Sequence, residues 1–595
     1  MGRKAKLNVC LAASIVIWSM VTPARGGIIY VDADASGANT GSSWADAFVR
    51  LQDALAAASN GDEVRVAAGV YRPDEDSANP QGSGDREAAF WLKSAVAVRG
   101  GYAGFGEEDP NERDIDEHET ILSGDLGEND GPGFANNGEN SDHVVAYSSF
   151  IGTAVLEGFT ITGGNANAMD PFSGGGLINI GGRLRANTCK ITGNSAASRG
   201  GGVFNFMFGD LTLTNCLIVG NRATFSGGME NRYSSEATLI NCALLGNAAS
   251  YDGGGFGNSG AAATVINCII SGNWADGRGG GMYNRFDTDV TVANSILWGN
   301  TAAEGPQITL RYNNTLSISY CDLQGGQQDV NVVESFIDWG DGNIDQDPCF
   351  ASPGYWDISG VWTDGNYRLL PGSACIDMAS NGSVPMDIDD LDGDGNTVEL
   401  IPVDLGGYAR IVDGDKDGNS VVDMGAYEFF VPPLEVPMHL TPRVLNALSR
   451  GNWFKAHFIL PEEFGVGDVD ANRPAEMEPL NVESEYINVF VNDEGLVELE
   501  VAFARSDLCG AAGDFDPAEL TVTCWFTNGD AFYGVQTVTI IDKSIEYIAA
   551  CASNWLRSDC GTPDWCEGLD INSDSVVDFA DFALLTACGI EITAD

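Results

Sequence analysis

Residues Gly227–Asn247 read GGMENRYSSEATLINCALLGN, and residues Gly253–Asn273 read GGGFGNSGAAATVINCIISGN. The same pattern recurs every 26 or 27 residues between about Leu156 and Gly326. It combines a glycine cluster, an asparagine three residues after the last glycine, and a cysteine or serine followed four residues later by Gly-Asn. A period of this length indicates a solenoid of stacked units. The asparagines are Asn179, Asn205, Asn231, Asn258 and Asn284, and the third signature begins at Cys189, Cys216, Cys242, Cys268 and Ser295.

Each unit contains short alternating runs such as Leu211–Leu213 and Thr264–Ile266, bounded by glycine and asparagine as strands are. No unit has room for a pair of helices without a glycine inside one of them. We therefore predict an all-β fold in which each unit is one coil of a right-handed parallel β-helix, with two or three short strands. Equivalent residues would stack about 4.8 Å apart, so that asparagines form hydrogen-bonded ladders and inward aliphatic side chains fill the core.

The repeat cysteines are predicted to be buried free thiols. Neighbours in register keep their Cβ atoms near the strand spacing, which is longer than the ~3.8 Å that a disulfide prefers. A metal site is also disfavoured, because the sulfurs would be collinear and not tetrahedral. These residues should act as small hydrophobic side chains.

The glycine clusters with their asparagines, and the Asn-x-Gly-Asn units, resemble those of secreted bacterial right-handed parallel β-helix proteins. That group spans pectate-lyase-like enzymes and polymorphic outer membrane protein repeats. The resemblance implies the fold that the period predicts. It does not fix the function, because β-helices host lyases, hydrolases and adhesins alike.

Length and charge bound the function further. The 595 residues are enough for several domains. The 85 acidic and 30 basic residues give a net charge of −55, which argues against nucleic acid as a partner and favours cations, above all Ca²⁺. Residues 1–26 read as a signal peptide, with Arg3, Lys4 and Lys6 before an apolar run too short to span a membrane comfortably. We predict an extracellular or cell-surface protein with no transmembrane span in the mature chain.

The remaining chain divides by composition. Residues 27–150 should form an N-terminal cap and the first coils, with strands at Ile28–Asp32 and Val64–Tyr71 and a helix at Leu51–Ala58 that covers the open first coil. The long polar loops at 73–88 and 104–142 are of a kind that often carries function. Residues 151–345 are the repeats, and residues 346–431 resemble the closing segment of secreted β-helix proteins. After a Pro-Pro linker, residues 434–543 predict an immunoglobulin-like β-sandwich in which Cys509 can bridge Cys524.

The alternation of inward and outward side chains along each strand identifies candidate functional residues in the repeats. If Asn231 and Asn284 point inward, their sequence neighbours point outward, and Arg232 and Arg285 lie two coils, roughly 10 Å, apart on one face. With Arg311 nearby, this face is a candidate polysaccharide-binding surface. In pectate-lyase-like enzymes, Ca²⁺ held by carboxylates neutralises uronate and a basic residue removes the α-proton; here only residue types match. The catalytic candidates are Arg232, Arg285, Asp252 and Asp287, and the other outward neighbours are Glu230 and Tyr283.

Three acidic loops are candidate calcium sites, because alternate carboxylates beside a glycine turn can surround Ca²⁺ with oxygen. Two have the pattern D-x-D-x-D-G and lack an acid at position twelve: Asp390, Asp392 and Asp394, and Asp413, Asp415 and Asp417. The third, in residues 544–595, resembles one dockerin-type EF-hand repeat, and the resemblance implies as ligands Asp570, Asn572, Asp574, the Val576 carbonyl, Asp578 and Asp581. A dockerin has two loops, so the missing second loop leaves a cohesin-type partner unsupported.

Two functions remain open on the sequence. One is a non-catalytic, calcium-stabilised protein that binds extracellular polysaccharide or a cell-surface protein. The other is a polysaccharide lyase or glycoside hydrolase of pectate-lyase-like type, which the dockerin-like segment favours, because such segments are typical of polysaccharide-degrading proteins.

Overall fold

The computed structural model describes residues 26–167, 173–430, 434–441, 444–446, 453–462, 464–492, 495–504, 518–527 and 530–541. They belong to two compact units, Met1–Phe429 and Phe430–Asp595. The predicted signal peptide, the dockerin-like loop and Cys509 lie outside the described residues. Within them, no helix is long and apolar enough to cross a membrane.

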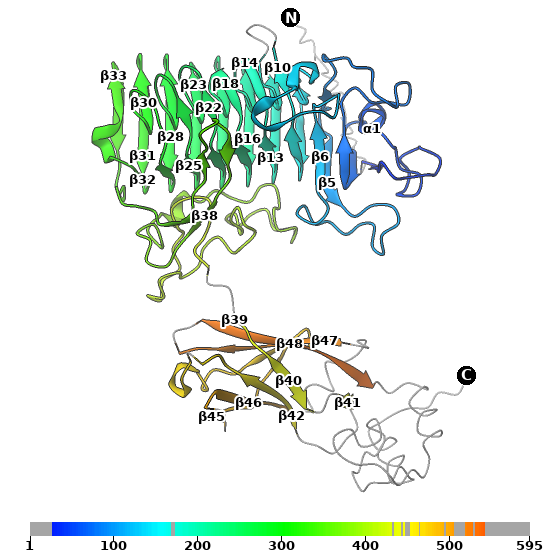
Figure 1. Ribbon diagram of the computed structural model, residues 1–595, viewed down its shortest axis with the longest axis vertical. Helices are drawn as coiled ribbons and strands as arrows, with labels where there is room; N and C mark the ends of the chain where they lie inside the picture. Colours follow the sequence, from blue (N-terminus) through cyan, green and yellow to red (C-terminus); the bar gives the residue numbers. More distant parts are fainter. Residues whose placement is uncertain are drawn as a thin grey trace, which may run out of the picture. The chain divides into compact units, whose positions relative to one another are not determined.

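The first unit is a right-handed parallel β-helix whose coils stack in a row (Figure 1). Its longest sheet, sheet A, pairs 11 strands in parallel. They are β1 (Ile28–Val31), β2 (Glu63–Ala67), β5 (Ala97–Tyr102), β8 (Thr153–Glu157), β12 (Arg183–Asn187), β16 (Asp210–Thr214), β20 (Glu236–Ile240), β24 (Ala262–Ile266), β28 (Asp289–Ala293), β31 (Thr315–Ser319) and β34 (Phe336–Trp339).

Two further sheets of nine strands each complete the coils. Sheet B contains β3 (Gly69–Tyr71), β6 (Thr120–Ser123), β9 (Thr160–Thr162), β13 (Lys190–Thr192), β17 (Leu217–Val219), β21 (Ala243–Leu245), β25 (Ile269–Ser271), β29 (Ile296–Trp298) and β32 (Asp322–Leu323). Sheet C contains β4 (Phe90–Trp91), β7 (Val145–Tyr147), β11 (Leu177–Ile180), β15 (Val203–Phe206), β19 (Met229–Arg232), β23 (Phe256–Ser259), β27 (Met282–Arg285), β30 (Ile308–Arg311) and β33 (Asn331–Val333).

Five coils have a fourth strand, which corrects the prediction of two or three. The residues after each Gly-Asn pair also find their equivalents one coil away and form sheet D. Its strands are β10 (Asn165–Ala166), β14 (Ser195–Arg199), β18 (Arg222–Phe225), β22 (Ala248–Ala249) and β26 (Trp274–Ala275). The strand predicted at Val64–Tyr71 is likewise two, β2 and β3, because the chain turns between them at Gly69, whose φ is +144°.

The register of the predicted asparagine ladder is confirmed, and its side-chain hydrogen bonds run from Asn179 to Asn258, whereas the buried amide of Asn284 has no hydrogen-bond partner within the described residues. Asn205, Asn231, Asn258 and Asn284 are direct partners in sheet C. The amide of Asn205 donates to Asn231 Oδ1 at 2.9 Å, and that of Asn231 donates to Asn258 Oδ1 at 3.0 Å. The asparagines of the Gly-Asn pairs form a second ladder. A third one, which the sequence analysis missed, joins the residues that directly precede Cys216, Cys242, Cys268 and Ser295, namely Asn215, Asn241, Asn267 and Asn294, all at positive φ.

One continuous apolar core runs through the coils. The repeat cysteines are buried free thiols, as predicted, and Cys216 donates to the Ala186 carbonyl at 3.2 Å. The predicted helix is α1 (Leu51–Ala57), and its buried Leu51, Ala54 and Leu55 close one end of this core. Short 3₁₀ turns are η1 (Pro132–Phe134), η2 (Asn137–Glu139), η3 (Gly326–Asp329) and η4 (Asn381–Ser383).

The segment after the coils packs along their side. Phe350, Tyr367 and Leu369 share an apolar cluster with Val219 and Ile269 of sheet B. Two small hairpins shape the segment, β35 (Phe350–Ser352) with β38 (Asn366–Leu369), and β36 (Tyr355–Trp356) with β37 (Trp362–Thr363). It therefore covers the outer face of sheet B, and both predicted acidic loops belong to it.

The second unit contains two sheets around one apolar core. One sheet has the order β39 (Leu434–Glu435), β48 (Ala531–Ile541), β47 (Ala518–Trp525), β43 (Glu476–Glu478) and β44 (Val482–Glu483), with β41 (Val444–Asn446) also on β48. The other has the order β40 (Met438–Thr441), β42 (Trp453–Ile459), β46 (Val497–Ala504) and β45 (Tyr486–Val491), and η5 is Val466–Asp468. Phe454, Phe458, Phe503 and Phe532 fill the space between them, which is the packing of a β-sandwich.

Candidate functional site

Sheet C presents a column of arginines beside a column of aromatic rings. Its register aligns Arg232, Ser259, Arg285 and Arg311 on successive coils, at the ends of β19, β23, β27 and β30. An exposed ring follows each arginine directly in the sequence. We call these six residues the arginine–aromatic face: Arg232, Tyr233, Arg285, Phe286, Arg311 and Tyr312.

The three aromatic residues of this face have a left-handed backbone conformation, which residues other than glycine rarely adopt. The φ angles are +58° at Tyr233, +63° at Phe286 and +71° at Tyr312. Gly260 occupies the coil between Tyr233 and Phe286 with a φ of +61°, so glycine satisfies the turn without strain. Left-handed conformations of bulky residues gather where a structure needs the side chain for function. Each ring is nonetheless between 41 % and 50 % exposed.

Each arginine lies against the ring that follows it. The guanidinium carbon is 4.3 Å from the ring centre for Arg232 and Tyr233, 5.7 Å for Arg285 and Phe286, and 5.6 Å for Arg311 and Tyr312. The rings of Phe286 and Tyr312 are stacked at 5.1 Å. The buried Nε of Arg311 has no hydrogen-bond partner within the described residues. The face therefore combines flat apolar surfaces with charged hydrogen-bond donors.

A buried carboxylate lies beneath the face. Glu230 on β19 was predicted to point outward, and it does lie on that side of the strand, but only 2 % of its surface is exposed. Arg199 of sheet D and Arg285 cover it, each with a guanidinium nitrogen 3.5 Å from Glu230 Oε1, and Ser226 Oγ donates to its Oε2. Gly257 takes the position of Glu230 on the next coil, in one column along the sheet, and a Cβ there would collide with the Glu230 carboxylate. Tyr283 of the same column is buried as well.

The other catalytic candidates lie beside the face. Asp252 is 7 % exposed, and burial raises its pKa, while the charges of Arg278, Arg285 and Arg311 oppose the rise. Its Oδ1 is 3.7 Å from Arg278 Nη1. Asp287 is exposed at the turn and accepts a hydrogen bond from the Asn313 amide. The structure thus brings Arg232, Arg285 and Asp252 to one region, as predicted, and leaves Asp287 at its edge.

Charge balance at this region differs from that of the chain. Five arginines (Arg199, Arg232, Arg278, Arg285 and Arg311) meet five carboxylates (Glu230, Asp252, Asp287, Glu304 and Glu334, which follows Tyr312 in line one coil on), so the charges of this region cancel. The whole chain carries −55. The arginine–aromatic face therefore repels an anionic group less than the rest of the chain does.

The first predicted acidic loop brings its three carboxylates together. Oxygen atoms of Asp390, Asp392 and Asp394 lie within 4.8 Å of one another. The sequence analysis missed two neighbours. Asp387 is 1 % exposed, and its Oδ1 has no hydrogen-bond partner within the described residues; Glu399 has a pKa raised by burial and then by Asp394, Asp392 and Asp387. Three convergent carboxylates, with Asp387 and Glu399 electrostatically coupled to them, suit a divalent cation.

The second predicted loop is assembled differently. Asp413 and Asp415 converge with Asp377, a residue from an earlier turn, within 4.8 Å. Asp377 Oδ2 accepts the Asp415 N–H at 2.6 Å, whereas Asp417 Oδ1 accepts the N–H of Asn419. A cation here would find Asp377 as its third carboxylate, a ligand that no local spacing indicates.

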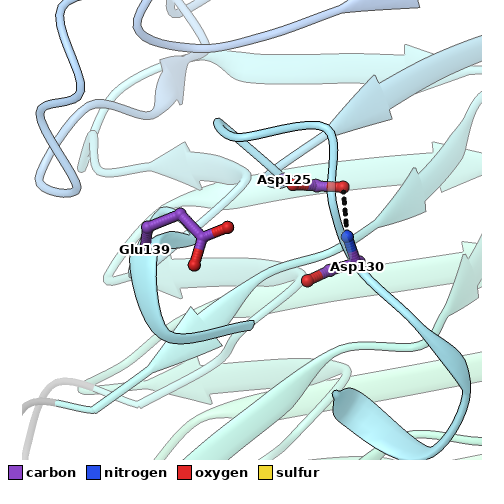
Figure 2. Close-up of side chains that lie close together, drawn as sticks. All are labelled: Asp125, Asp130 and Glu139. Atoms are coloured by element: carbon purple, nitrogen blue, oxygen red, sulfur yellow. Dashed lines mark hydrogen bonds between the residues drawn. The ribbon is translucent and has the colours of Figure 1, made fainter. Parts of the chain in front are cut away.

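A third acidic group lies in the long polar loop before β7. Figure 2 shows Asp125, Asp130 and Glu139 converging across this loop, with the Asp130 N–H donating to Asp125 at 3.1 Å. Asn140 donates to Asp130 Oδ2 at 2.6 Å. Burial, together with the charges of Asp125 and Glu139, raises the pKa of Asp130. The spacing of these residues matches no calcium motif, so the sequence analysis found only the loop.

Comparisons with known proteins add little to this geometry. No protein-family model matches the chain, and no curated protein matches its sequence. A solved structure described as pectate lyase Pel9A is similar with 12 % sequence identity and a TM-score of 0.37, over 68 % of this chain and 97 % of that one. A likeness this weak carries no argument, so the fold rests on the strand pairing and the function on the side chains.

Proposed function

We propose that this chain is an extracellular or cell-surface protein that binds an anionic polysaccharide along the arginine–aromatic face. One observation carries the proposal. Tyr233, Phe286 and Tyr312 hold left-handed backbone conformations, in line with glycines, and each lies beside an arginine. Backbone strain of this kind clusters at ligand-binding and active sites.

The chemistry of the face suits a chain of sugar rings. The C–H groups of a pyranose pack on the electron-rich face of an aromatic ring, and side chains in line along the coils offer such surfaces in a row. Guanidinium groups donate paired hydrogen bonds to carboxylate or sulfate groups. A region in which the charges cancel, on a chain of net charge −55, repels an acidic polymer less than the rest of the chain does.

Calcium is part of the proposal. We assign it to the loop of Asp390, Asp392 and Asp394, with Asp387 and Glu399, and to Asp413 and Asp415 with Asp377. The convergence of their carboxylates supports this assignment. For the loop from Asp570 to Asp581 calcium remains a sequence-based proposal. Bound cations would neutralise the closing segment against sheet B and so stabilise the β-helix.

A lyase or glycoside hydrolase is the second candidate, and Asp252 favours it. A buried carboxyl with a raised pKa beside three arginines is the kind of group that serves as a general acid or base. Its place next to the arginine–aromatic face means that the same glycan would pass it. The structure offers Asp252, Arg285 and Arg232 for that role and fixes no order of events among them.

Affinity electrophoresis of the full chain in gels that contain polygalacturonate or alginate tests the proposal. Retardation should weaken in the Arg311→Met variant. The matched control is Arg183→Met, which removes an exposed arginine of sheet A paired with Asp210 at 2.7 Å and should keep the native retardation. Equal retardation of both variants and the native chain contradicts the proposal. Release of ultraviolet-absorbing unsaturated sugars, abolished by Asp252→Asn, would establish the lyase instead.

A further inference from the structure

A separate cleft lies at the corner between sheets B and D. Its volume is about 360 Å³. The floor comes from the corners of three coils, including Thr162 and Thr192 at the ends of β9 and β13. One wall is the loop that contains Phe134, and the other is the hairpin of β36 and β37 with Trp356 and Trp362.

The two walls are joined above the floor. A Cβ on Gly133 of the loop would lie 3.4 Å from Val361 of the hairpin, so the segments touch there. Arg222 of β18 contacts both: its guanidinium carbon is 5.2 Å from the centre of the Phe134 ring, and its Nη2 donates to the Gly360 carbonyl at 3.0 Å. The cleft is therefore a built feature, fixed by one arginine from the repeat array.

The two tryptophans that line the cleft present apolar ring surface to it. Trp362 packs on the glycine column of the Gly-Asn pairs, since a Cβ at Gly246 or Gly272 would collide with its ring. Trp356 lies edge-on to it at 5.3 Å and donates its indole N–H to the Gly272 carbonyl at 2.8 Å. The buried Nε1 of Trp362 has no hydrogen-bond partner within the described residues. This unpaired donor belongs to a residue that lines the cleft, so it suits a ligand acceptor that can reach it.

The charge of the cleft opposes an anionic ligand. Asp130 and Asp364 line it against the single positive charge of Arg222, and the carboxylates of Asp125 and Glu139 lie within 4.8 Å of that of Asp130 (Figure 2). Hydroxyl groups suit such a lining, because they donate to carboxylates and accept from Arg222 and from the indole N–H. The ring surfaces of Trp356, Trp362 and Phe134 suit the C–H faces of the same ligand.

We propose that this cleft binds a neutral oligosaccharide and is a second glycan site, distinct from the arginine–aromatic face. Sites of this size enclose a small ligand with a few placed polar groups. A neutral ligand here and an anionic one on sheet C would let one chain connect two kinds of polysaccharide.

Calorimetric titration and saturation-transfer NMR of the full chain with cellohexaose, xylohexaose and mannohexaose test the proposal. At least one hexaose should bind, with or without calcium. Trp362→Phe keeps a ring over the glycine column and removes the N–H, and should weaken binding about tenfold. Thr192→Phe should fill the floor and abolish binding. Trp274→Phe changes an exposed tryptophan of sheet D and should leave binding unchanged.

Two outcomes would overturn the proposal. One is that none of the three hexaoses binds, or that they bind equally well to the Trp362→Phe and Thr192→Phe variants. The other is that the cleft variants weaken the binding of hexagalacturonate in the presence of calcium but do not weaken the binding of any neutral hexaose. The Arg311→Met variant separates the two sites, because it should lose polygalacturonate and keep the neutral hexaose.

Discussion

Replacing Phe286 by glycine separates a binding role of the arginine–aromatic face from a structural one. The φ of Phe286 is +63°, a conformation that costs an L-residue roughly 1–2 kcal/mol and glycine nothing. Against this gain, glycine adds about 0.5–1 kcal/mol of unfolded-state entropy. The lost stacking on Tyr312, 5.1 Å away, costs about 0.5–1.5 kcal/mol. These terms largely offset, and the loss of the half-buried ring surface adds a cost of about 1 kcal/mol, so the free energy of unfolding should fall by no more than about 2 kcal/mol.

Binding should weaken measurably while the chain remains folded. Loss of a half-exposed ring from the middle of the column should weaken polygalacturonate binding about tenfold, which corresponds to about 1.4 kcal/mol. Urea denaturation and affinity electrophoresis measure the two effects on the same protein. Ser234→Gly is the matched control, because Ser234 has a φ of +57° and no ring. Unchanged binding by Phe286→Gly would refute the reasoning, and a loss of several kcal/mol in stability would show that the ring is structural.

Three further predictions concern the β-helix itself. Asn231→Ala should lower the free energy of unfolding by about 2–4 kcal/mol, because it removes an acceptor of the Asn205 amide and the buried donor to Asn258 Oδ1 and to the Ala262 carbonyl. A loss below about 1 kcal/mol by urea denaturation would contradict the ladder's role. Burial raises the pKa of Asp322 to about 7 from an ordinary value of 3.8, so the folded state takes up a proton and stability should fall as the pH rises from about 4 to about 7. Asp322→Asn should remove that part of the pH dependence and stabilise the chain at about pH 8. Parallel curves of stability against pH for the two proteins would contradict this prediction. Calcium should raise the melting temperature of the native chain, and a chelator should reverse the rise. Asp392→Asn should reduce the rise. An identical response of both proteins would show that the Asp390–Asp394 loop is not a calcium site.

The period explains what could be predicted from the sequence. In-register stacking follows directly from units of equal length, and so the ladder of Asn231, the buried Cys242 and the alignment of Arg232 with Arg285 were all predictable. The third ladder had a signal too, since an asparagine precedes three of the repeat cysteines. The fourth strand of five coils was missed, and with it part of the burial of Glu230, because Arg199, one of the two arginines that cover it, belongs to sheet D.

What could not be predicted depends on segments that have no period. Asp377 joins Asp413 and Asp415 through the fold of the closing segment, and no spacing rule connects them. Phe134 and Trp362 face one cleft only because a loop and a hairpin, far apart in the sequence, meet over the same coils. Such contacts between irregular segments are set by tertiary packing, which local pattern does not encode.

Hydrogen–deuterium exchange of the full chain with and without saturating polygalacturonate tests the central claim most directly. We predict slower exchange in the turns that carry Tyr233, Phe286 and Tyr312, and unchanged exchange in the second unit. Saturation without protection of these turns, or protection confined to residues 434–541, would contradict the account.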